Sequence, residues 1–338
     1  MAYEQRKAAA DDRMRRRALL ASAVAAGLAS KAWAQSSAVP RIAYLSGRSQ
    51  WTDSHLLEAF SEGLKATGYV DGQNVKVEVR WADGRYDQVP ALAAEIAATK
   101  PDLIVAVGGN PVAVAAKQAT STIPVVFGAG ADPVAIGVVS NLNRPDGNLT
   151  GMTLSAQDLD AKRLELLHDL VPQAQSVALL MNPNNPGANE ELRLTREAAT
   201  ALKLKLEILK ASSSSDIERA FEALPMGRID ALAVAADAFL INRRDRIIAL
   251  TAERRLPAIF PAREFTVDGG LASYGARWSD MYRILGSYAG RILKGAKPAD
   301  LPVQRPTTYE LVINLRTAKA LNLALPPLFL NRADEVLE

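Results

Sequence analysis

A unit of strand, glycine turn, helix and strand occurs twice in this chain, and the duplication constrains the fold more than any other feature. In the first copy, residues 103–107 and 125–127 are short apolar runs, typical of strands covered on both faces in a parallel sheet. In the second copy, residues 230–235 and 256–260 repeat these runs about 130 positions later. The pattern predicts two βα lobes in tandem with a cleft between them.

The repeat extends upstream in both copies. Residues 41–47 match residues 176–182, and each of these runs is followed by a helical pattern and a further strand. This alternation predicts an α/β fold of two Rossmann-like lobes with parallel sheets, joined by a hinge. We expect an export signal in 1–34, lobe one in 35–153 and 276–306, and lobe two in 154–275 and 307–338.

Hydrophobic periodicity and turn signals place the individual elements. We expect the chain to cross between lobes at strands 149–154 and 269–274, and helix 278–293 to return to lobe one. The tail after residue 315 has no predicted place. The other expected strands are 42–45, 75–81, 103–107, 125–127, 177–181, 204–209, 231–235, 258–260 and 308–315, and the other expected helices include 54–67, 85–99, 158–170, 188–202 and 241–254.

Composition excludes several classes of function. The chain has no cysteine, which excludes disulfides, thiolate metal sites, a cysteine nucleophile and a lipoprotein anchor. Its two histidines, His55 and His168, lie far apart in sequence, so we expect no multi-histidine metal site. Without residues 1–34 the chain has 33 basic and 34 acidic residues, and this near-neutral balance argues against nucleic acid as a partner.

Residues 1–34 have the pattern of an export signal. Arg13 and residues 15–17 form a basic region, and residues 18–30 form an apolar stretch too short to span a bilayer. The triplet 32–34 is an A-x-A cleavage site, which places the start of the mature chain at Gln35. The signal predicts a periplasmic protein exported by the Sec or the twin-arginine route. The alternative is an uncleaved N-terminal anchor.

The ends of the predicted strands give the candidate binding residues. In open parallel sheets, ligands bind beyond the carboxyl ends of the strands. The residues at those ends are mostly small, polar or aromatic, and several precede helix N-termini, whose N–H groups suit an anionic group. The candidate ligand-binding residues are Ser46, Gly47, Gly109, Asn110, Pro111, Gly128, Ala129 and Asp132 in lobe one, and Asn182, Ala236, Asp237 and Tyr274 in lobe two.

Each of these candidates also has a purely structural interpretation. The turn at Gly109 and Asn110 either binds an anion or simply joins strand to helix. Asp132 and Asp237 either bind a ligand ammonium group or cap helices. Tyr274 either stacks on a ligand ring or fills the hinge. Arg48 either pairs with a ligand carboxylate or is an ordinary surface or inter-lobe charge.

Catalytic and cofactor motifs are not visible in the sequence. Residues 128–133 resemble part of a dinucleotide fingerprint, but Pro133 replaces the third glycine and the segment follows a fourth strand. The chain has no G-x-x-x-x-G-K-[ST] loop, no G-x-S-x-G elbow and no H-E-x-x-H motif. We therefore expect no enzymatic activity, no cofactor and no metal.

Several longer stretches resemble one protein family. They are residues 63–74, 80–87, 122–127, 141–151, 162–168, 269–275, 289–295 and 332–336. Together they resemble the ABC transporter substrate-binding proteins of the tryptophan/tyrosine-binding-like group, which have the type I periplasmic binding fold. The resemblance extends from Arg41 to the end of the chain.

The resemblance implies a monomer whose two lobes close on a small molecule and present it to an inner-membrane ABC permease. It also implies a ligand that is an amino acid, possibly aromatic, or a related carboxylate. It does not identify that ligand. The alternative is a periplasmic sensor that presents the same fold to a membrane receptor.

Overall fold

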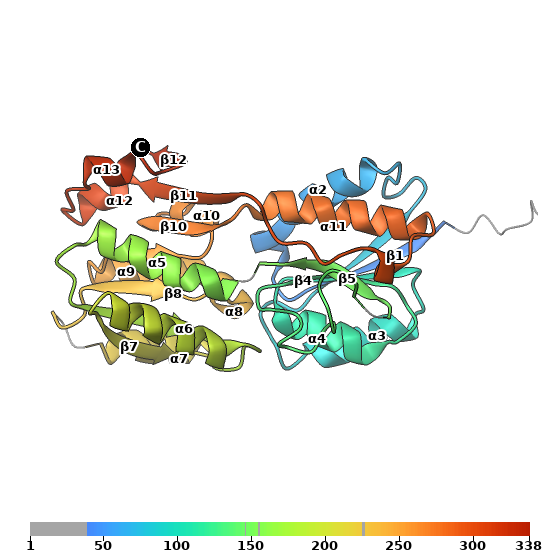
Figure 1. The fold of residues 1–338 in the computed structure, drawn as a ribbon, viewed down its shortest axis with the longest axis horizontal. Helices are drawn as coiled ribbons and strands as arrows, with labels where there is room; N and C mark the ends of the chain where they lie inside the picture. Colours follow the sequence, from blue (N-terminus) through green and yellow to red (C-terminus); the bar gives the residue numbers. More distant parts are fainter. Residues whose placement is uncertain (1–38, 146, 155, 225–226) are drawn as a thin grey trace, which may run out of the picture. The chain divides into compact units, whose positions relative to one another are not determined.

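The computed structural model describes residues 39–338 except 146, 155 and 225–226, so the expected export signal lies outside the described residues. Residues 40–338 contain two separate sheets, shown side by side in Figure 1. One has five strands in the order β2-β1-β3-β4-β5, and the other has seven in the order β12-β11-β10-β9-β8-β6-β7. The predicted α/β fold with two lobes is confirmed.

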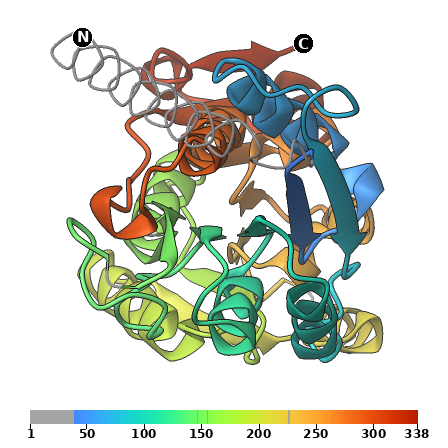
Figure 2. The same cartoon turned by 90° about the vertical axis from the view of Figure 1, so that its right-hand side faces the viewer.

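Lobe one is the five-stranded sheet with its two layers of helices. Alternate side chains of one strand enter opposite layers: Ile42 and Tyr44 belong to one core cluster, and Ala43 and Leu45 to another. Figure 2 shows the helix layers on either side of the strands. The strands are β1 (Arg41–Ser46), β2 (Lys76–Trp81), β3 (Leu103–Val107), β4 (Val125–Ala129) and β5 (Leu149–Thr153), with α2 (Gln50–Lys65) and α11 (Trp278–Leu293) on one face and α3 (Val89–Ala98) and α4 (Asn110–Ala119) on the other.

Lobe two is the seven-stranded sheet with its helices. Its edge departs from the predicted parallel pattern, because β11 runs antiparallel to β10 and the tail adds β12 parallel to β11. The strands are β6 (Ser176–Met181), β7 (Lys205–Lys210), β8 (Ala231–Val234), β9 (Ala258–Phe260), β10 (Ala272–Ala276), β11 (Tyr309–Asn314) and β12 (Glu335–Leu337); the helices are α5 (Ala156–Leu170), α6 (Ala188–Ala201), α7 (Ser214–Glu222), α8 (Ala238–Ile241), α9 (Arg244–Glu253), α10 (Arg263–Val267), α12 (Leu315–Ala320) and α13 (Pro327–Leu330). Within the described ranges, no helix has both the length and the apolarity needed to cross a membrane.

Three short segments connect the lobes. The chain leaves lobe one after β5 and returns after β10, close to the two expected crossings. A third crossing leads from Gln304 to β11, near the lobe boundary expected between residues 306 and 307. Gln304 is still part of lobe one, because its N–H donates to Gly151 O (3.0 Å) and its carbonyl accepts from Thr153 N (2.9 Å).

One expected helix is divided in two. Residues 241–254 were expected to be continuous, but α8 ends at Ile241 and α9 begins at Arg244. The Asn242 side chain lies at the break and accepts hydrogen bonds from Ser49 N (3.2 Å) and Thr52 Oγ1 (3.1 Å) of lobe one. The break therefore places a polar side chain where it bridges the two lobes. Helix α3 is also shorter than expected, and residues 133–142 form turns.

Two glycines allow α2 and α11 to pack at very short range, although these helices come from opposite ends of the chain. A Cβ on Gly286 would lie 2.0 Å from Phe60 O, and a Cβ on Gly63 would lie 1.9 Å from Arg283 O. Real Cβ atoms do not approach backbone this closely, so each position requires glycine. This contact attaches α11 to lobe one.

We predict that Gly286→Ala destabilises the protein, because the new methyl group forces α11 away from α2. The free energy of unfolding should fall by about 2 kcal/mol or more. Urea unfolding measures this change. Ser287→Ala, on the next position of α11, is the matched control and should change stability by less than about 0.5 kcal/mol. Equal stability of the two variants would contradict the close packing.

Candidate functional site

A narrow cavity lies between the lobes at the carboxyl ends of both sheets. Its free volume is about 50 Å³. Six of the predicted residues line it: Gly109, Asn110, Gly128, Ala129, Ala236 and Asp237. The strand-end rule therefore located the cavity. Residues that lie far apart in sequence meet there.

Three other predicted residues support the cavity without lining it. Ser46 Oγ accepts from Arg48 N (3.2 Å), and Asn182 Nδ2 donates to Asp237 Oδ1 (3.2 Å). Gly47 packs against the neighbouring turn, where a Cβ would lie 2.4 Å from Gly108 O. These residues shape the cavity from behind.

The remaining three predicted residues lie elsewhere. Pro111 occupies the first turn of α4. Asp132 accepts from Val134 N (2.8 Å) and stabilises a local turn, because residues 133–142 do not form the helix that a capping role requires. The Tyr274 ring stacks on Tyr309 with centroids 6.3 Å apart and does not line the cavity. Successive side chains of a strand point to opposite faces, so a strand-end position alone does not decide which way a side chain points.

Asp237 has the capping role that the sequence allowed, and it also lies at the cavity. It caps α8, accepting from Leu240 N (3.1 Å), and it lines the cavity. Its other oxygen accepts from Tyr86 Oη of lobe one (2.5 Å). Burial raises the pKa of Asp237, and the hydrogen bond from Tyr86 acts in the opposite direction.

Asn110 forms a second bridge between the lobes. Its Nδ2 donates to Asn185 Oδ1 (3.0 Å) and to Pro186 O (2.8 Å), both in lobe two. Its Oδ1 accepts from Gly130 N (2.7 Å) and Ala131 N (2.9 Å) in lobe one. Together with the Tyr86 and Asn242 bridges, these contacts hold the lobes in a closed arrangement.

Arg48 is a lining residue that sequence reasoning considered but did not select. Its side chain comes from the turn after β1 and is only 6% exposed. Nη1 lies 3.3 Å from Asp53 Oδ1, and the guanidinium lies 3.8 Å above the Trp278 ring. Nε is buried without a hydrogen-bond acceptor. Its position directly after Gly47, at the end of a predicted strand, was the signal that could have identified it.

Sequence reasoning also missed a buried acidic pair beside the cavity. Asp160 and Glu191 are both buried and share a hydrogen bond, and Arg163 Nη1 donates to Asp160. They line a small pocket together with Asn110, which also lines the main cavity. Burial raises the pKa of Glu191 well above its ordinary value, and the Asp160 charge adds to the effect.

The site has opposite charges on its two sides. Lobe one contributes Arg48, which also pairs with Asp53, and lobe two contributes Asp237. The N-terminus of α4 also faces the cavity through Asn110. This arrangement suits a molecule with a carboxylate and an ammonium group. Within the described ranges, no cluster of His, Asp and Glu is suited to a metal ion.

Two lobes with a cavity at the carboxyl ends of both sheets define a type I periplasmic binding architecture. Within this class, the sequence matches one particular family. The family model for ABC transporter substrate binding proteins matches residues 52–337, so the chain belongs to that family.

Individual relatives cover most of the chain. It is 30% identical over 268 residues to a tyrosine-binding protein of Clostridioides difficile (strain R20291), covering 79% of this chain and 76% of the relative. It is 25% identical to an ABC domain in complex with L-Trp from Streptococcus pneumonia, with a TM-score of 0.81 over 89% of this chain and 100% of the other. A ligand-free, open substrate-binding protein with adhesive properties from Clostridium difficile is also 25% identical, with a TM-score of 0.64 over 88% and 99% of the two chains.

We predict that Glu191→Gln changes how stability depends on pH. The folded-state pKa of Glu191 is raised, so the stability that protonated Glu191 contributes is fully present below its unfolded pKa of about 4.3 and is lost as pH rises through the folded-state pKa. The amide is neutral at every pH and keeps the hydrogen bond to Asp160.

Melting temperatures of both proteins at pH 5 and pH 8 measure this effect. Between pH 5 and pH 8, the variant should lose less stability than the wild type, and the difference should be on the order of 1 kcal/mol. Glu197→Gln, on the exposed face of α6, is the control and should follow the wild type. Identical pH dependence of Glu191→Gln and wild type would contradict the raised pKa of Glu191.

Proposed function

We propose that this chain is an exported solute-binding protein of an ABC importer, and that it captures an aromatic amino acid between its lobes. The observation that carries the proposal is the polarity of the inter-lobe cavity, with Arg48 on one wall and Asp237 on the other. Family membership supports solute capture.

We call Arg48 and Asp237, on opposite walls of the cavity, its two poles. The protein itself leaves the charge of each pole incompletely satisfied. Arg48 Nε is buried without an acceptor, although leaving a buried donor unpaired costs about 1–3 kcal/mol. The partners of Asp237 are the neutral donors of Tyr86, Asn182 and the α8 backbone. A ligand carboxylate beside Arg48 and a ligand ammonium beside Asp237 satisfy both groups. A free amino acid carries both charges on one carbon.

The remaining lining favours an aromatic side chain. Trp278, Tyr282 and Tyr86 line the cavity, together with the aliphatic side chains of Leu154 and Ile241. Aromatic rings stack or pack edge to face on such surfaces, which contributes about 0.5–1.5 kcal/mol beyond the burial of area. The names of two relatives point the same way, since one is a tyrosine-binding protein and the other is in complex with L-Trp.

Capture requires the lobes to move. The cavity of about 50 Å³ is far smaller than the roughly 300–1,000 Å³ typical of ligand pockets, so a ligand enters only when the lobes separate. At equal sequence identity, the structure is more similar to the L-Trp complex (TM-score 0.81) than to the open, ligand-free relative (TM-score 0.64). Both observations support a closed form that ligand binding selects from an open one.

The proposal includes the cellular setting. Residues 1–34 direct export by the Sec or twin-arginine route, and the mature chain acts in the periplasm without a cofactor. Residues 35–153 with 276–306 move as one body, and residues 154–275 with 307–338 as the other. The closed form then delivers the amino acid to an inner-membrane permease. The basic and apolar pattern of the N-terminus and the family match support this setting.

We predict that isothermal titration of the exported, purified protein detects binding of tyrosine or tryptophan, and that both poles are required. Asp237→Asn keeps the α8 cap but removes the charge facing the ligand ammonium. Arg48→Gln removes the charge facing the carboxylate. Each variant should raise the Kd at least tenfold, which corresponds to about 1.4 kcal/mol. Tyramine, which has no carboxylate, should bind the wild type at least tenfold more weakly than tyrosine.

Asp132→Asn is the matched control for Asp237→Asn, since it makes the same change in a turn outside the cavity. It should bind like the wild type. The ligand assignment is wrong if the wild type binds no aromatic amino acid, or if Asp237→Asn and Asp132→Asn bind equally well.

A further inference from the structure

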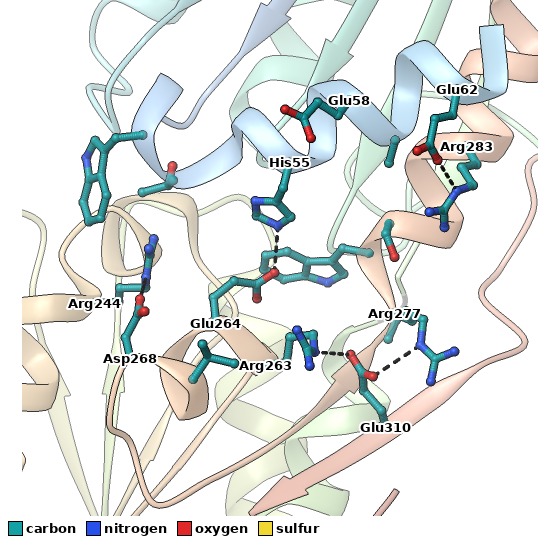
Figure 3. A pocket seen from close by; sticks show the side chains of 17 residues that line it. His55, Glu58, Glu62, Arg244, Arg263, Glu264, Asp268, Arg277, Arg283 and Glu310 are labelled. Atoms are coloured by element: carbon teal, nitrogen blue, oxygen red, sulfur yellow. Dashed lines mark hydrogen bonds and ion pairs between the residues drawn. The ribbon is translucent and has the colours of Figure 1, made fainter. Parts of the chain in front are cut away.

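A second pocket, larger than the cavity, opens on the side of the molecule formed by α2 and α10. Its free volume is about 500 Å³. Figure 3 shows α2 of lobe one above it and α10 and β11 of lobe two below it. We call this pocket the groove. On lobe one, a face of α2 lines the groove, and Trp51, His55, Glu58 and Glu62 follow one another on it at helical spacing. Trp278, Ser279 and Arg283 of α11 complete the lobe-one side.

The charged side chains of the groove are already paired with one another. Glu310 lies between Arg277 (3.3 Å) and Arg263 (3.5 Å), as Figure 3 shows. Arg244 pairs with Asp268 (2.6 Å). A small anion therefore has no free set of convergent cations to bind. Among the described residues that line the groove, Glu58 is an exposed carboxylate without an ion pair, so the unbalanced charge on the rim is negative.

The rim of the groove also exposes apolar surface on both lobes. Trp51 on α2 is 55% exposed and Val267 at the end of α10 is 52% exposed. The Arg244 guanidinium lies 4.5 Å from the Trp51 ring and holds it in place. Exposed Trp and Arg are the side chains most enriched in protein interfaces. The surface thus fits a protein segment that carries an apolar and a basic side chain.

The groove depends on closure of the lobes. His55 of α2 lies 3.0 Å from Glu264 of α10, across the lobe boundary. Trp278 lines both the groove and the inter-lobe cavity, and Arg48 stacks on it. Separation of the lobes pulls α2 and α10 apart and divides the groove. A partner that binds both walls therefore distinguishes the closed form from the open one.

We propose that the groove is the surface through which the closed protein docks on its membrane partner, an extracytoplasmic segment of the permease with a basic and an apolar side chain. The basic side chain pairs with Glu58, and the apolar side chain packs on Trp51 and Val267. This inference rests on the proposed function, because it assigns a surface to the partner of that function.

The test separates docking from ligand binding. The full chain, as wild type, Glu58→Lys or Trp51→Ala, is expressed in the native host from which the chromosomal copy has been deleted, and uptake of radiolabelled tyrosine is measured. The Kd for tyrosine is measured on each purified protein. We expect both variants to lower uptake at least tenfold while the Kd stays within twofold of wild type. Both side chains are exposed, so the variants should fold, which circular dichroism checks.

Glu95→Lys, on the exposed face of α3, is the matched control and should support wild-type uptake. Wild-type uptake by Glu58→Lys and Trp51→Ala overturns the inference, and so does a parallel loss of uptake and affinity, which would assign the groove to ligand binding. If the wild type binds tyrosine but restores no uptake, the partner is not a permease, although capture stands. If the wild type binds no tyrosine, the proposed function itself fails and the inference fails with it.

Discussion

Burial of polar strand ends between two lobes is the constraint on which this structure depends. Parallel sheets place their functional turns at one edge, and here the edges of two sheets face each other. Closure takes these turns out of water, so each buried polar group needs a partner. Asn110, Tyr86 and the side-chain oxygen of Asn242 find theirs on the opposite lobe or its turns. Arg48 pairs with Asp53 but leaves its Nε without an acceptor, and Asp237 accepts only from neutral donors. These are the two groups that we assign to the ligand.

The two pockets share one wall, and this links ligand capture to the outer surface. Trp278 begins α11 directly after the second crossing, and it borders both the cavity and the groove. Arg48 stacks on its ring from the cavity side. A ligand carboxylate that engages Arg48 therefore acts on the same side chain that shapes the groove. The close packing of α11 on α2 through Gly63 and Gly286 holds this wall to lobe one.

Much of this architecture is predictable from sequence because duplication and periodicity are local signals. The repeated apolar runs identify both lobes, and the apolar spacing of residues 278–293 identifies the returning helix. The antiparallel direction of β11 is not predictable this way, because strand direction depends on pairing across the chain. Likewise, the strand-end rule identifies Asn110 and Asp237, whereas the buried pair of Asp160 and Glu191 lies on helices and becomes part of the site only through tertiary packing.

The distance between the lobes tests the central claim most directly. The chain contains no cysteine, so Asp87→Cys on lobe one and Asn184→Cys on lobe two provide two unique sites for spin labels. Both residues line a pocket at the mouth between the lobes and are exposed. Pulsed electron paramagnetic resonance then measures the distance with and without tyrosine. The account predicts a longer distance in the free protein and a shorter, narrower distribution with tyrosine. An identical distribution in both states would contradict capture by closure.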